Sequence, residues 1–273
     1  MRVFISSDME GTAGVVDWDQ CRPSGSEYGH YRELLEQEVN AAIEGAAAAG
    51  AREFLVNDSH SAMSNLRPER LAHRARYLMC IRDRYMMQGL DASFDAVFFV
   101  AYHGSMSGAP ATLSHTYNPR AIAEVRLNGL SAGEAGINAL VALGHRVPVV
   151  LITGDDATAA QIQPFCPGVR AAVVKNSVSR FAADSLHPEQ AREVIAQAAG
   201  AAIRGLAHAR LPEIALPATL TVRFRNADLA EMATWINGVH REDVLTVLLR
   251  DDDPVRLYRT FVTVVLLTRG IAE

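Results

Sequence analysis

The feature that most constrains the fold of this chain is a short apolar segment that stops abruptly at acidic residues. Residues 3–5 are Val-Phe-Ile, and Asp8 and Glu10 follow shortly after them. An apolar run without a turn residue is typical of a buried strand. If the backbone stays extended, the Asp8 and Glu10 side chains point to the same side. Two carboxylates at one strand end repel each other unless a proton or a cation lies between them. If a cation lies there, we expect further metal ligands at the ends of the neighbouring strands.

Two further apolar segments end in groups that can bind a metal. The strand predicted over residues 53–57 is followed by Asp58 and His60, and the strand predicted over residues 95–102 is followed by His103. In open parallel sheets, ligands bind at the carboxyl ends of the strands. These side chains are therefore predicted to share one edge of one sheet with Asp8 and Glu10.

Strands and helices alternate through this part of the chain. A strand over residues 147–152 ends before Asp155 and Asp156, and a helix over residues 133–143 is predicted with Glu134 in its first turn and Gly144 as its stop. The other predicted elements here are a helix over residues 31–49, strands over residues 76–81 and 169–174, and a hairpin or edge strand at residues 122–129. Near-continuous apolar strands alternating with helices predict an α/β fold, with a mostly parallel sheet covered by helices on both faces.

Beyond about residue 179 the pattern changes to that of a smaller α+β domain. A long alanine-rich helix over residues 188–204 leads to a linker bracketed by Pro212 and Pro217. After the linker, we predict a strand over residues 218–224, a helix over residues 227–235, a strand over residues 243–249 and a helix over residues 253–267, although β-branched residues at 261–265 also suit a strand. The predicted domains are residues 1–180 for metal binding and catalysis, and residues 181–273 for support and assembly.

Composition narrows the classes of partner. A net charge of −5 and the lack of a basic block give no reason to expect nucleic acid or a membrane surface as partner. We therefore expect small molecules or further copies of the chain. Three widely spaced cysteines, Cys21, Cys80 and Cys166, argue against a disulfide framework and a thiolate zinc site. The cysteines therefore favour a reducing, cytoplasmic setting. A predicted strand at residues 3–5, where a secretory leader would lie, favours the same setting.

Each candidate ligand also has an ordinary structural explanation. Asp8 suits a turn cap, Glu134 suits the first turn of a helix, and for Asp155 a helix N-cap is the preferred interpretation. As a set, however, two imidazoles and three carboxylates suit Zn²⁺, with Mn²⁺ or Co²⁺ as substitutes. Five ligands exceed what one catalytic zinc uses, so two ions sharing a bridging carboxylate are the economical arrangement.

Four ordered motifs resemble the DppA-type D-aminopeptidases, a family of dinuclear zinc peptidases. They are Ser7-Asp8-Met9-Glu10-Gly11, Asn57-Asp58-Ser59-His60, Tyr102-His103-Gly104 and Ser131-Ala132-Gly133-Glu134-Ala135-Gly136-Ile137-Asn138. The first of these is the family's most specific sign. The resemblance runs from the first strand to about residue 156, and the rest of the chain is compatible in length and pattern.

The resemblance implies a zinc-dependent aminopeptidase that removes the N-terminal residue of short peptides, with D-amino acids expected there, by means of a hydroxide between two ions. Asp8 would bridge the two zinc ions, with Glu10 and His60 on one and His103 and Glu134 on the other. His115, matching an additional family histidine, would act on the developing charge or the leaving amine. The family also implies a homodecamer, a ten-subunit double ring.

Two alternatives remain open at this point. The same ligands would serve a dinuclear metallohydrolase of another amide or phosphoester bond, although the motifs' flanks are poor in the cations that phosphoester cleavage favours. Arg120 and Lys175 are the nearest candidates for such a cation. The other alternative is a metal-binding or ring-forming scaffold without catalysis, which would not need all five ligands and His115. Asn57, Asp58 and Asp155 are candidates to orient the imidazoles by hydrogen bonds.

Overall fold

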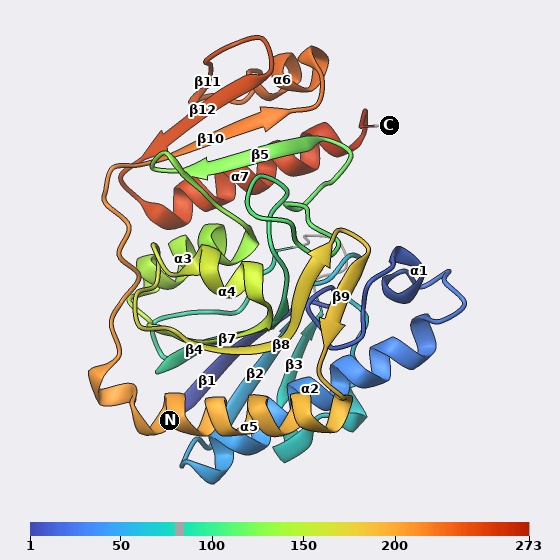
Figure 1. The fold of residues 1–273 in the computed structure, drawn as a ribbon. Helices are drawn as coiled ribbons and strands as arrows, with labels where there is room; N and C mark the ends of the chain where they lie inside the picture. The colour runs from blue at the N-terminus through green and yellow to red at the C-terminus, as the bar shows by residue number, and fades with distance from the viewer. Residues whose placement is uncertain (80–84, 273) are drawn as a thin grey trace.

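The computed structural model describes residues 1–79 and 85–272. A seven-stranded sheet forms its centre, in the order β3-β2-β1-β4-β7-β8-β9 (Figure 1). Its strands are β1 (Arg2–Ser7), β2 (Glu53–Asp58), β3 (Arg76–Met79), β4 (Ala96–Tyr102), β7 (Val149–Asp155), β8 (Arg170–Ser179) and β9 (Ala182–Ser185). All neighbouring pairs are parallel except β8–β9. The predicted α/β fold with a mostly parallel sheet is therefore confirmed.

Helices cover both faces of this sheet. On one face, α2 (Tyr28–Ala48) and α5 (Pro188–Arg204) lie side by side, and on the other α3 (Glu134–His145) lies between the sheet and α7 (Pro254–Arg269) (Figure 1). The alternation of β1 sends Val3 and Ile5 into the core under α2 and α5, and Phe4 into the core shared with α3. All three side chains are fully buried, which explains why residues 3–5 are all apolar.

The order of the strands places a crevice beside β1. From β1 the chain moves through β2 to β3 on one side, and then returns to place β4, β7 and β8 on the other side. Connections that leave in opposite directions open a crevice at the carboxyl ends of the strands, where such folds bind ligands. The ends of β1, β2 and β4 therefore form the expected ligand-binding edge.

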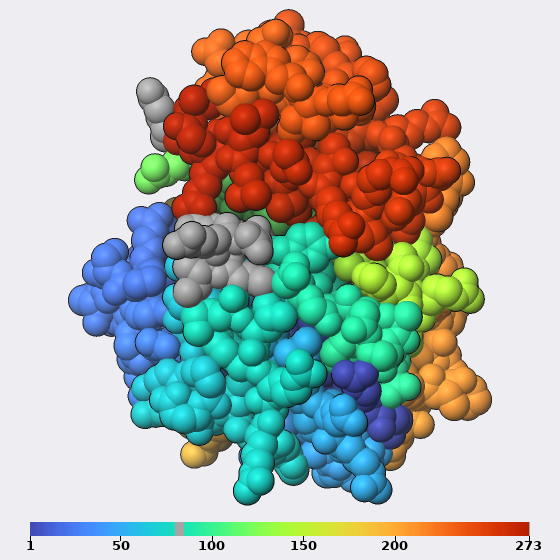
Figure 2. All heavy atoms as spheres, turned by 180° about the vertical axis from the view of Figure 1, so that it is seen from behind, coloured from blue at the N-terminus to red at the C-terminus, as the bar shows by residue number. Residues whose placement is uncertain are grey.

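A second, antiparallel sheet of five strands has the order β11-β12-β10-β5-β6. Its strands are β5 (Ile122–Leu127), β6 (Leu130–Ser131), β10 (Ala218–Phe224), β11 (Val239–Arg241) and β12 (Thr246–Asp251). Together with α6 (Ala227–Ala233) and α7 it forms the upper part of Figure 1. Figure 2 shows the part of this unit from residue 218 on from behind, in orange and red, directly against the green part of the chain. The division at residue 180 stays a prediction, and β5 pairs with β10 from beyond it.

The remaining elements are short. They are the helices α1 (Trp18–Cys21) and α4 (Asp156–Ile162) and the 3-10 helices η1 (Pro68–Arg70), η2 (Ala72–Arg74) and η3 (Leu206–His208). In the described part of the chain, no helix combines the length and the apolarity needed to cross a membrane.

Several element boundaries differ from the sequence predictions. Gly144 does not stop α3, which runs to His145 and ends at Arg146 in a left-handed conformation. Gly144 instead allows close packing on α7, because a Cβ there would collide with Val255. The strand predicted over residues 243–249 begins only at Thr246, and its first residues form a turn. β9 and β11 were not predicted. The end of the strand predicted over residues 76–81 lies outside the described residues.

The ambiguous C-terminal segment is helical, as favoured. Asp253 caps α7 by accepting hydrogen bonds from the backbone N–H groups of Val255 and Arg256 at 2.9 and 3.1 Å. Pro254 occupies the first helical position, which its fixed φ suits. These start signals outweigh the β-branched residues that follow them.

Candidate metal centre

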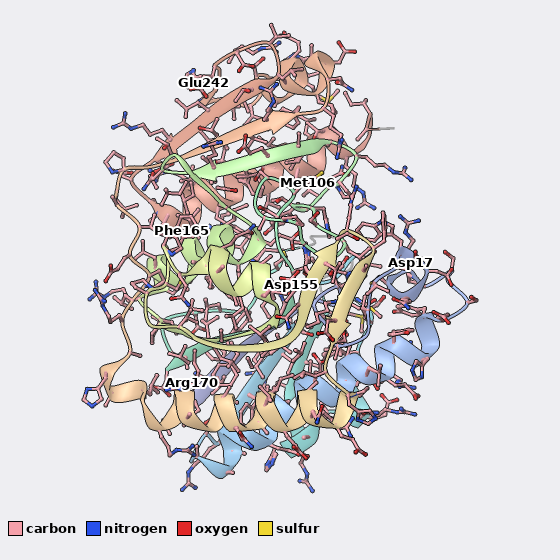
Figure 3. The ribbon with its side chains drawn as sticks, in the orientation of Figure 1. Asp17, Met106, Asp155, Phe165, Arg170 and Glu242 are labelled. Carbon is pink, nitrogen blue, oxygen red and sulfur yellow. The ribbon has the colours of Figure 1, made fainter. Side chains whose placement is uncertain are left out.

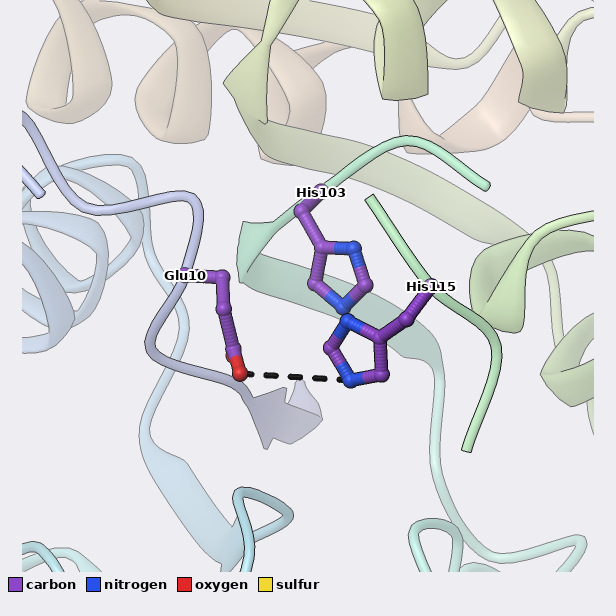
Figure 4. Close-up of side chains that lie close together, drawn as sticks. All are labelled: Glu10, His103 and His115. Carbon is purple, nitrogen blue, oxygen red and sulfur yellow. Dashed lines mark ion pairs between the residues drawn. The ribbon is translucent and has the colours of Figure 1, made fainter. Parts of the chain in front are cut away.

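The six residues singled out from the sequence meet at the carboxyl edge of the central sheet. Asp8 and Glu10 follow β1, His60 follows β2, His103 and His115 follow β4, and Glu134 begins α3. All six are buried, with exposed fractions of 8% or less. Figure 4 shows Glu10, His103 and His115 converging from different segments. A buried cluster of this composition needs mutual neutralisation or bound cations.

His60 presents one ring nitrogen to the carboxylates. Its Nε2 lies 2.8 Å from the carbonyl oxygen of Cys21, which can only accept a hydrogen bond, so Nε2 carries the hydrogen. Its Nδ1 then points at Glu10 Oε2, 2.9 Å away, and Asp8 Oδ1, 3.3 Å away. The nitrogen that no backbone carbonyl occupies is thus held where a metal ligand is required.

His103 has the same arrangement with its nitrogens exchanged. Its Nδ1 donates to the carbonyl oxygen of Gly104 at 3.0 Å, which leaves Nε2 facing Asp8 Oδ2 at 3.4 Å and Glu134 Oε1 at 3.7 Å. Among the described residues, His103 Nε2 and Asp8 Oδ2 are buried without a hydrogen-bond partner. Buried polar atoms are nearly always satisfied, so this pair fits a ligand that lies between the two atoms.

His115 is stacked on His103, with ring centroids 4.2 Å apart and planes 7° from parallel. Its Nδ1 donates to the carbonyl oxygen of Leu113 at 2.9 Å. Its Nε2 is therefore a free acceptor, 3.7 Å from Glu134 Oε1 and 3.9 Å from Glu10 Oε1 (Figure 4). The edge of Trp18 packs against the same ring at 5.4 Å and limits its rotation.

Two groups of potential ligands share one carboxylate. Asp8, Glu10 and His60 form one group, and Asp8, His103 and Glu134 form the other, with the potential ligand atoms of each group within 4.8 Å of one another. A third group of Glu10, His103 and His115 overlaps both. Two imidazoles, three carboxylates and no thiolate are a donor set that zinc accepts. The residues present therefore fit bound zinc.

The pKa values of the cluster report the same excess of negative charge. Burial alone would lower the pKa of His103, but the neighbouring carboxylates of Asp8 and Glu134 raise it to about 10. Burial raises the pKa of Glu134 to about 8. Burial and the charge on His103 lower the pKa of His115 to about 3, so this ring is neutral. Positive charge is favoured in the gaps between these groups, which suits bound cations.

The backbone approaches closely beneath the cluster. The N–H of Gly11 donates to the carbonyl oxygen of Ala101 at 2.8 Å, and a Cβ at position 11 would collide with the carbonyl oxygen of Tyr102. Ala101 itself has a φ of 58°, unusual for a residue with a side chain. Strain of this kind is found at functional sites, where the surrounding structure maintains it. Here it turns the end of β4 so that His103 reaches the cluster.

Two buried charged residues hold the segment that carries Glu10, a role that the sequence indicated for neither of them. Lys175 on β8 donates to the carbonyl oxygens of Glu10, Thr12 and Val15, the last two at 3.1 and 2.6 Å. Glu38 on α2 accepts from the N–H of Ala13 at 2.8 Å. Lys175 therefore fixes the loop after β1 from below, and it does not line the cavity above the cluster.

The residues predicted to orient the imidazoles act on the backbone instead. Asp58 accepts from the N–H groups of Asn65 and Leu66, at the end of the loop that begins with His60. Asn65 Nδ2 in turn donates to the carbonyl oxygen of His60 at 2.8 Å. Asn57 donates to the carbonyl oxygen of Met86 and to no imidazole.

Asp155 is the N-cap of α4, as preferred from the sequence, because its side chain accepts from the N–H of Thr158 at 2.7 Å. Its other carboxylate oxygen accepts from the N–H of Gly104 at 3.3 Å. Figure 3 shows it at the junction of β7 and α4. The aspartate therefore holds the residue that follows His103 without touching the imidazole.

A cavity of about 390 Å³ lies over the cluster. Asp8, Glu10, His60, His115 and Glu134 line it together with apolar and cationic residues. The apolar ones are Met63, Met86, Val262, Val265 and Leu266, and the cationic ones are Arg22, Arg120 and Arg269. The cavity has room for a ligand a few residues long, and α7 supplies part of its wall.

Comparisons with known proteins agree with one another on the family. A family profile described as D-aminopeptidase matches residues 1–263. A D-aminopeptidase of Bacillus subtilis (strain 168) is 32% identical over 265 residues, which are 95% of this chain and 94% of the relative. Among solved structures, the chain is similar to the Zn-dependent D-aminopeptidase DppA from Bacillus subtilis, a self-compartmentalizing protease, with a TM-score of 0.94, 29% identity and 100% coverage of both chains.

These matches confirm the resemblance and the fold class expected from the sequence. The family profile extends well beyond the motifs that carried the resemblance, into the second sheet and α7. The chain therefore belongs to the D-aminopeptidase family, and it is an aminopeptidase, an enzyme of the hydrolase class.

Proposed function

We propose that this aminopeptidase binds two zinc ions per subunit and removes an N-terminal D-amino acid from short peptides. Asp8 is shared by both ions, Glu10 and His60 complete one ligand set, and His103 and Glu134 complete the other. One observation carries the proposal most directly. One ring nitrogen of His60 and one of His103 donate a hydrogen bond to a backbone carbonyl oxygen, and the other nitrogen of each ring points at buried carboxylates. This arrangement is typical of histidines that bind a metal through their other ring nitrogen.

Bound zinc would polarise a peptide carbonyl and lower the pKa of water enough to provide a nucleophile near neutral pH. The chain's own residues supply the rest. His115, neutral and with Nε2 unprotonated, accepts a proton at the site and returns it to the leaving amine. The stacked ring of His103 and the edge of Trp18 keep that nitrogen aimed at the cluster. The side chains of the cluster are buried, which strengthens each electrostatic contact.

The substrate proposal is tested with a stereochemical pair and a metal control. D-alanyl-glycine and L-alanyl-glycine differ only at the carbon that the pocket must recognise, and a phosphodiester such as bis(p-nitrophenyl) phosphate tests the rival bond. We expect hydrolysis of the D-peptide, loss of activity with a chelator, and recovery with zinc. Preferential cleavage of the phosphodiester would refute the proposal in favour of another metallohydrolase. Metal analysis should give two zinc ions per subunit.

The role of His115 is tested separately. His115→Ala should retain zinc, because the ring belongs to neither ligand set that shares Asp8, and it should lose about 10²–10⁴-fold in kcat, the usual contribution of a general acid–base. Full zinc content with unchanged turnover would remove His115 from the reaction. Loss of zinc would instead make it a ligand.

We also propose that the chain works as a homo-oligomer in the cytoplasm. The similar solved protein is described as self-compartmentalizing, and a homodecamer is the arrangement expected from the family. Cys21 and Cys166 are buried free thiols, which suits a reducing compartment. Light scattering coupled to size-exclusion chromatography tests the subunit number, and a monomer of 29.6 kDa would refute the assembly.

A further inference from the structure

The cavity carries charges of both signs. Asp8, Glu10 and Glu134 contribute carboxylates, whereas Arg22, Arg120 and Arg269 contribute guanidinium groups. A short peptide is itself a zwitterion, with an ammonium group at one end and a carboxylate at the other. An aminopeptidase must bring the amino end to the metal centre. The arginines are thus available for the carboxyl end.

The three arginines are free of carboxylate partners in the part of the chain that the structure describes. Several other arginines are paired with carboxylates: Arg67, Arg210, Arg241 and Arg256 each lie within 4 Å of a glutamate or an aspartate. Within residues 1–79 and 85–272, Arg22, Arg120 and Arg269 form no such ion pair. Their guanidinium groups can therefore form charge-assisted hydrogen bonds with a ligand.

The backbone around Arg120 is fixed before any ligand arrives. The N–H of Arg120 donates to Asn118 Oδ1 at 3.1 Å, and the N–H groups of Ala121 and Ile122 donate to the carbonyl oxygen of Asn118. Arg225 Nε donates to the carbonyl oxygen of Pro119 at 2.7 Å. The turn is thus held from both sides. Arg120 follows His115 closely in the chain, so its side chain enters the cavity beside the metal centre.

The other two arginines are also attached to fixed elements. The guanidinium of Arg22 lies 5.4 Å from the ring centroid of Trp18, the same ring whose edge packs on His115. Arg269 occupies the last turn of α7. The apolar side chains of Met63 and Val265 line the same cavity. They suit the side chain of an amino acid better than an isolated inorganic anion.

We propose that Arg120 and Arg269, with Arg22 beside them, form a subsite that binds the free C-terminal carboxylate of the peptide. The inference rests on the proposed aminopeptidase function and narrows its substrate class to short peptides with an unblocked carboxyl end. A carboxylate bound by planar guanidinium groups fixes the direction of the peptide as well as its affinity. Blocked or long peptides would not place their carboxyl group there.

The experiment compares D-alanyl-glycine with D-alanyl-glycinamide on the zinc-loaded protein. The two substrates share the scissile bond and differ only in the terminal charge. We expect the free acid to be preferred by about tenfold or more in kcat/KM, with the difference mainly in KM, because carboxylate binding persists through the reaction. Hydrolysis of both substrates at equal efficiency would refute the subsite and leave the proposed function standing. Hydrolysis of neither would count against both.

The arginines are tested by Arg120→Gln and Arg269→Gln. Each should reduce activity on the free acid and leave activity on the amide unchanged, a pattern that a loss of folding or of zinc cannot produce. Arg120→Lys should restore part of the preference. Arg170→Gln is the matched control, since Arg170 is an exposed residue at the start of β8, at the opposite end of the strand from the site (Figure 3).

Binding provides a readout that does not depend on turnover. A reduced-amide analogue of D-alanyl-glycine, with and without its carboxylate, can be titrated calorimetrically into the wild-type protein and Arg120→Gln. The carboxylate should improve affinity for the wild type alone. Equal gains in both proteins would exclude Arg120 from the subsite. A gain produced equally by added inorganic phosphate would indicate a phosphate site in place of a peptide site.

Discussion

Glu38 offers the clearest quantitative test of how the loop carrying Glu10 is held. This carboxyl group is only 2% exposed, accepts one hydrogen bond from Ala13, and has its second oxygen unpartnered among the described residues. Burial raises its pKa to about 7, against the opposing effects of the Ala13 hydrogen bond and the charge of Lys175. Ionised Glu38 is therefore unfavourable in the folded chain, and Glu38→Gln removes the ionisation while keeping the acceptor.

The sign follows from proton linkage. Between the ordinary glutamate value of 4.5 and about 7, the folded chain retains a proton that the unfolded chain releases. The stability of the wild type therefore falls as the pH rises through this window. With about 1.36 kcal/mol for each pKa unit, the whole difference amounts to roughly 3 kcal/mol. The quantity to compare is the unfolding free energy of Glu38→Gln minus that of the wild type. Between pH 4.5 and pH 8, this difference should rise by up to that amount.

Urea unfolding of both proteins at pH 5, 6, 7 and 8, with equal zinc and protein concentrations, measures this difference. Groups at the metal centre are common to both proteins and cancel in the comparison. Glu44→Gln is the control, because Glu44 is exposed on the same helix and should give a flat difference. A flat difference for Glu38→Gln as well would show that Glu38 is ionised in the folded chain, and the reasoning would fail.

Three further predictions concern the metal centre. Lys175→Met leaves three buried carbonyl oxygens without the Lys175 donor. We therefore expect a loss of roughly 2–4 kcal/mol in unfolding free energy, and weaker zinc binding in a chelator competition. Unchanged zinc affinity would show that the loop keeps its conformation without Lys175. Gly11→Ala places a Cβ against the Tyr102 carbonyl and should lower the melting temperature and the zinc content together, whereas normal zinc content would mean that β4 can move aside. Asp8→Asn should reduce zinc below one ion per subunit by mass spectrometry, because both ligand sets contain Asp8, and a remaining full equivalent would contradict a shared ligand.

The sequence predicts the parts of this protein that depend on local pattern. Apolar runs such as residues 95–102 favour buried strands, and a histidine at the end of such a run must find a polar partner. β9 and β11 escape prediction because they are short and largely exposed, so their residues carry little apolar periodicity. Their pairing comes from neighbouring strands rather than from their own composition.

The supports of the metal centre are harder to predict than its ligands. The hydrogen bond that orients His60 is accepted by the backbone carbonyl oxygen of Cys21, and any residue type would supply that carbonyl. Lys175 looks like a cation for a substrate phosphate until the structure places it beneath the loop after β1. Arg120 does line the cavity. Nothing in the sequence separates these two cations, because burial is decided by strands far apart in the chain.

The C-terminal elements reach the metal centre through a chain of polar contacts. Glu134 Oε1 accepts from the N–H of Tyr117 at 2.7 Å, and the hydroxyl of Tyr117 lies 2.6 Å from that of Tyr258 on α7. Tyr117 also donates to Asn138, which follows Glu134 on α3. A chain that ended at residue 180 would lose Tyr258 and the α7 wall of the cavity together. The position of Glu134, and with it one of the two proposed ligand sets, therefore depends on residues beyond the predicted catalytic domain.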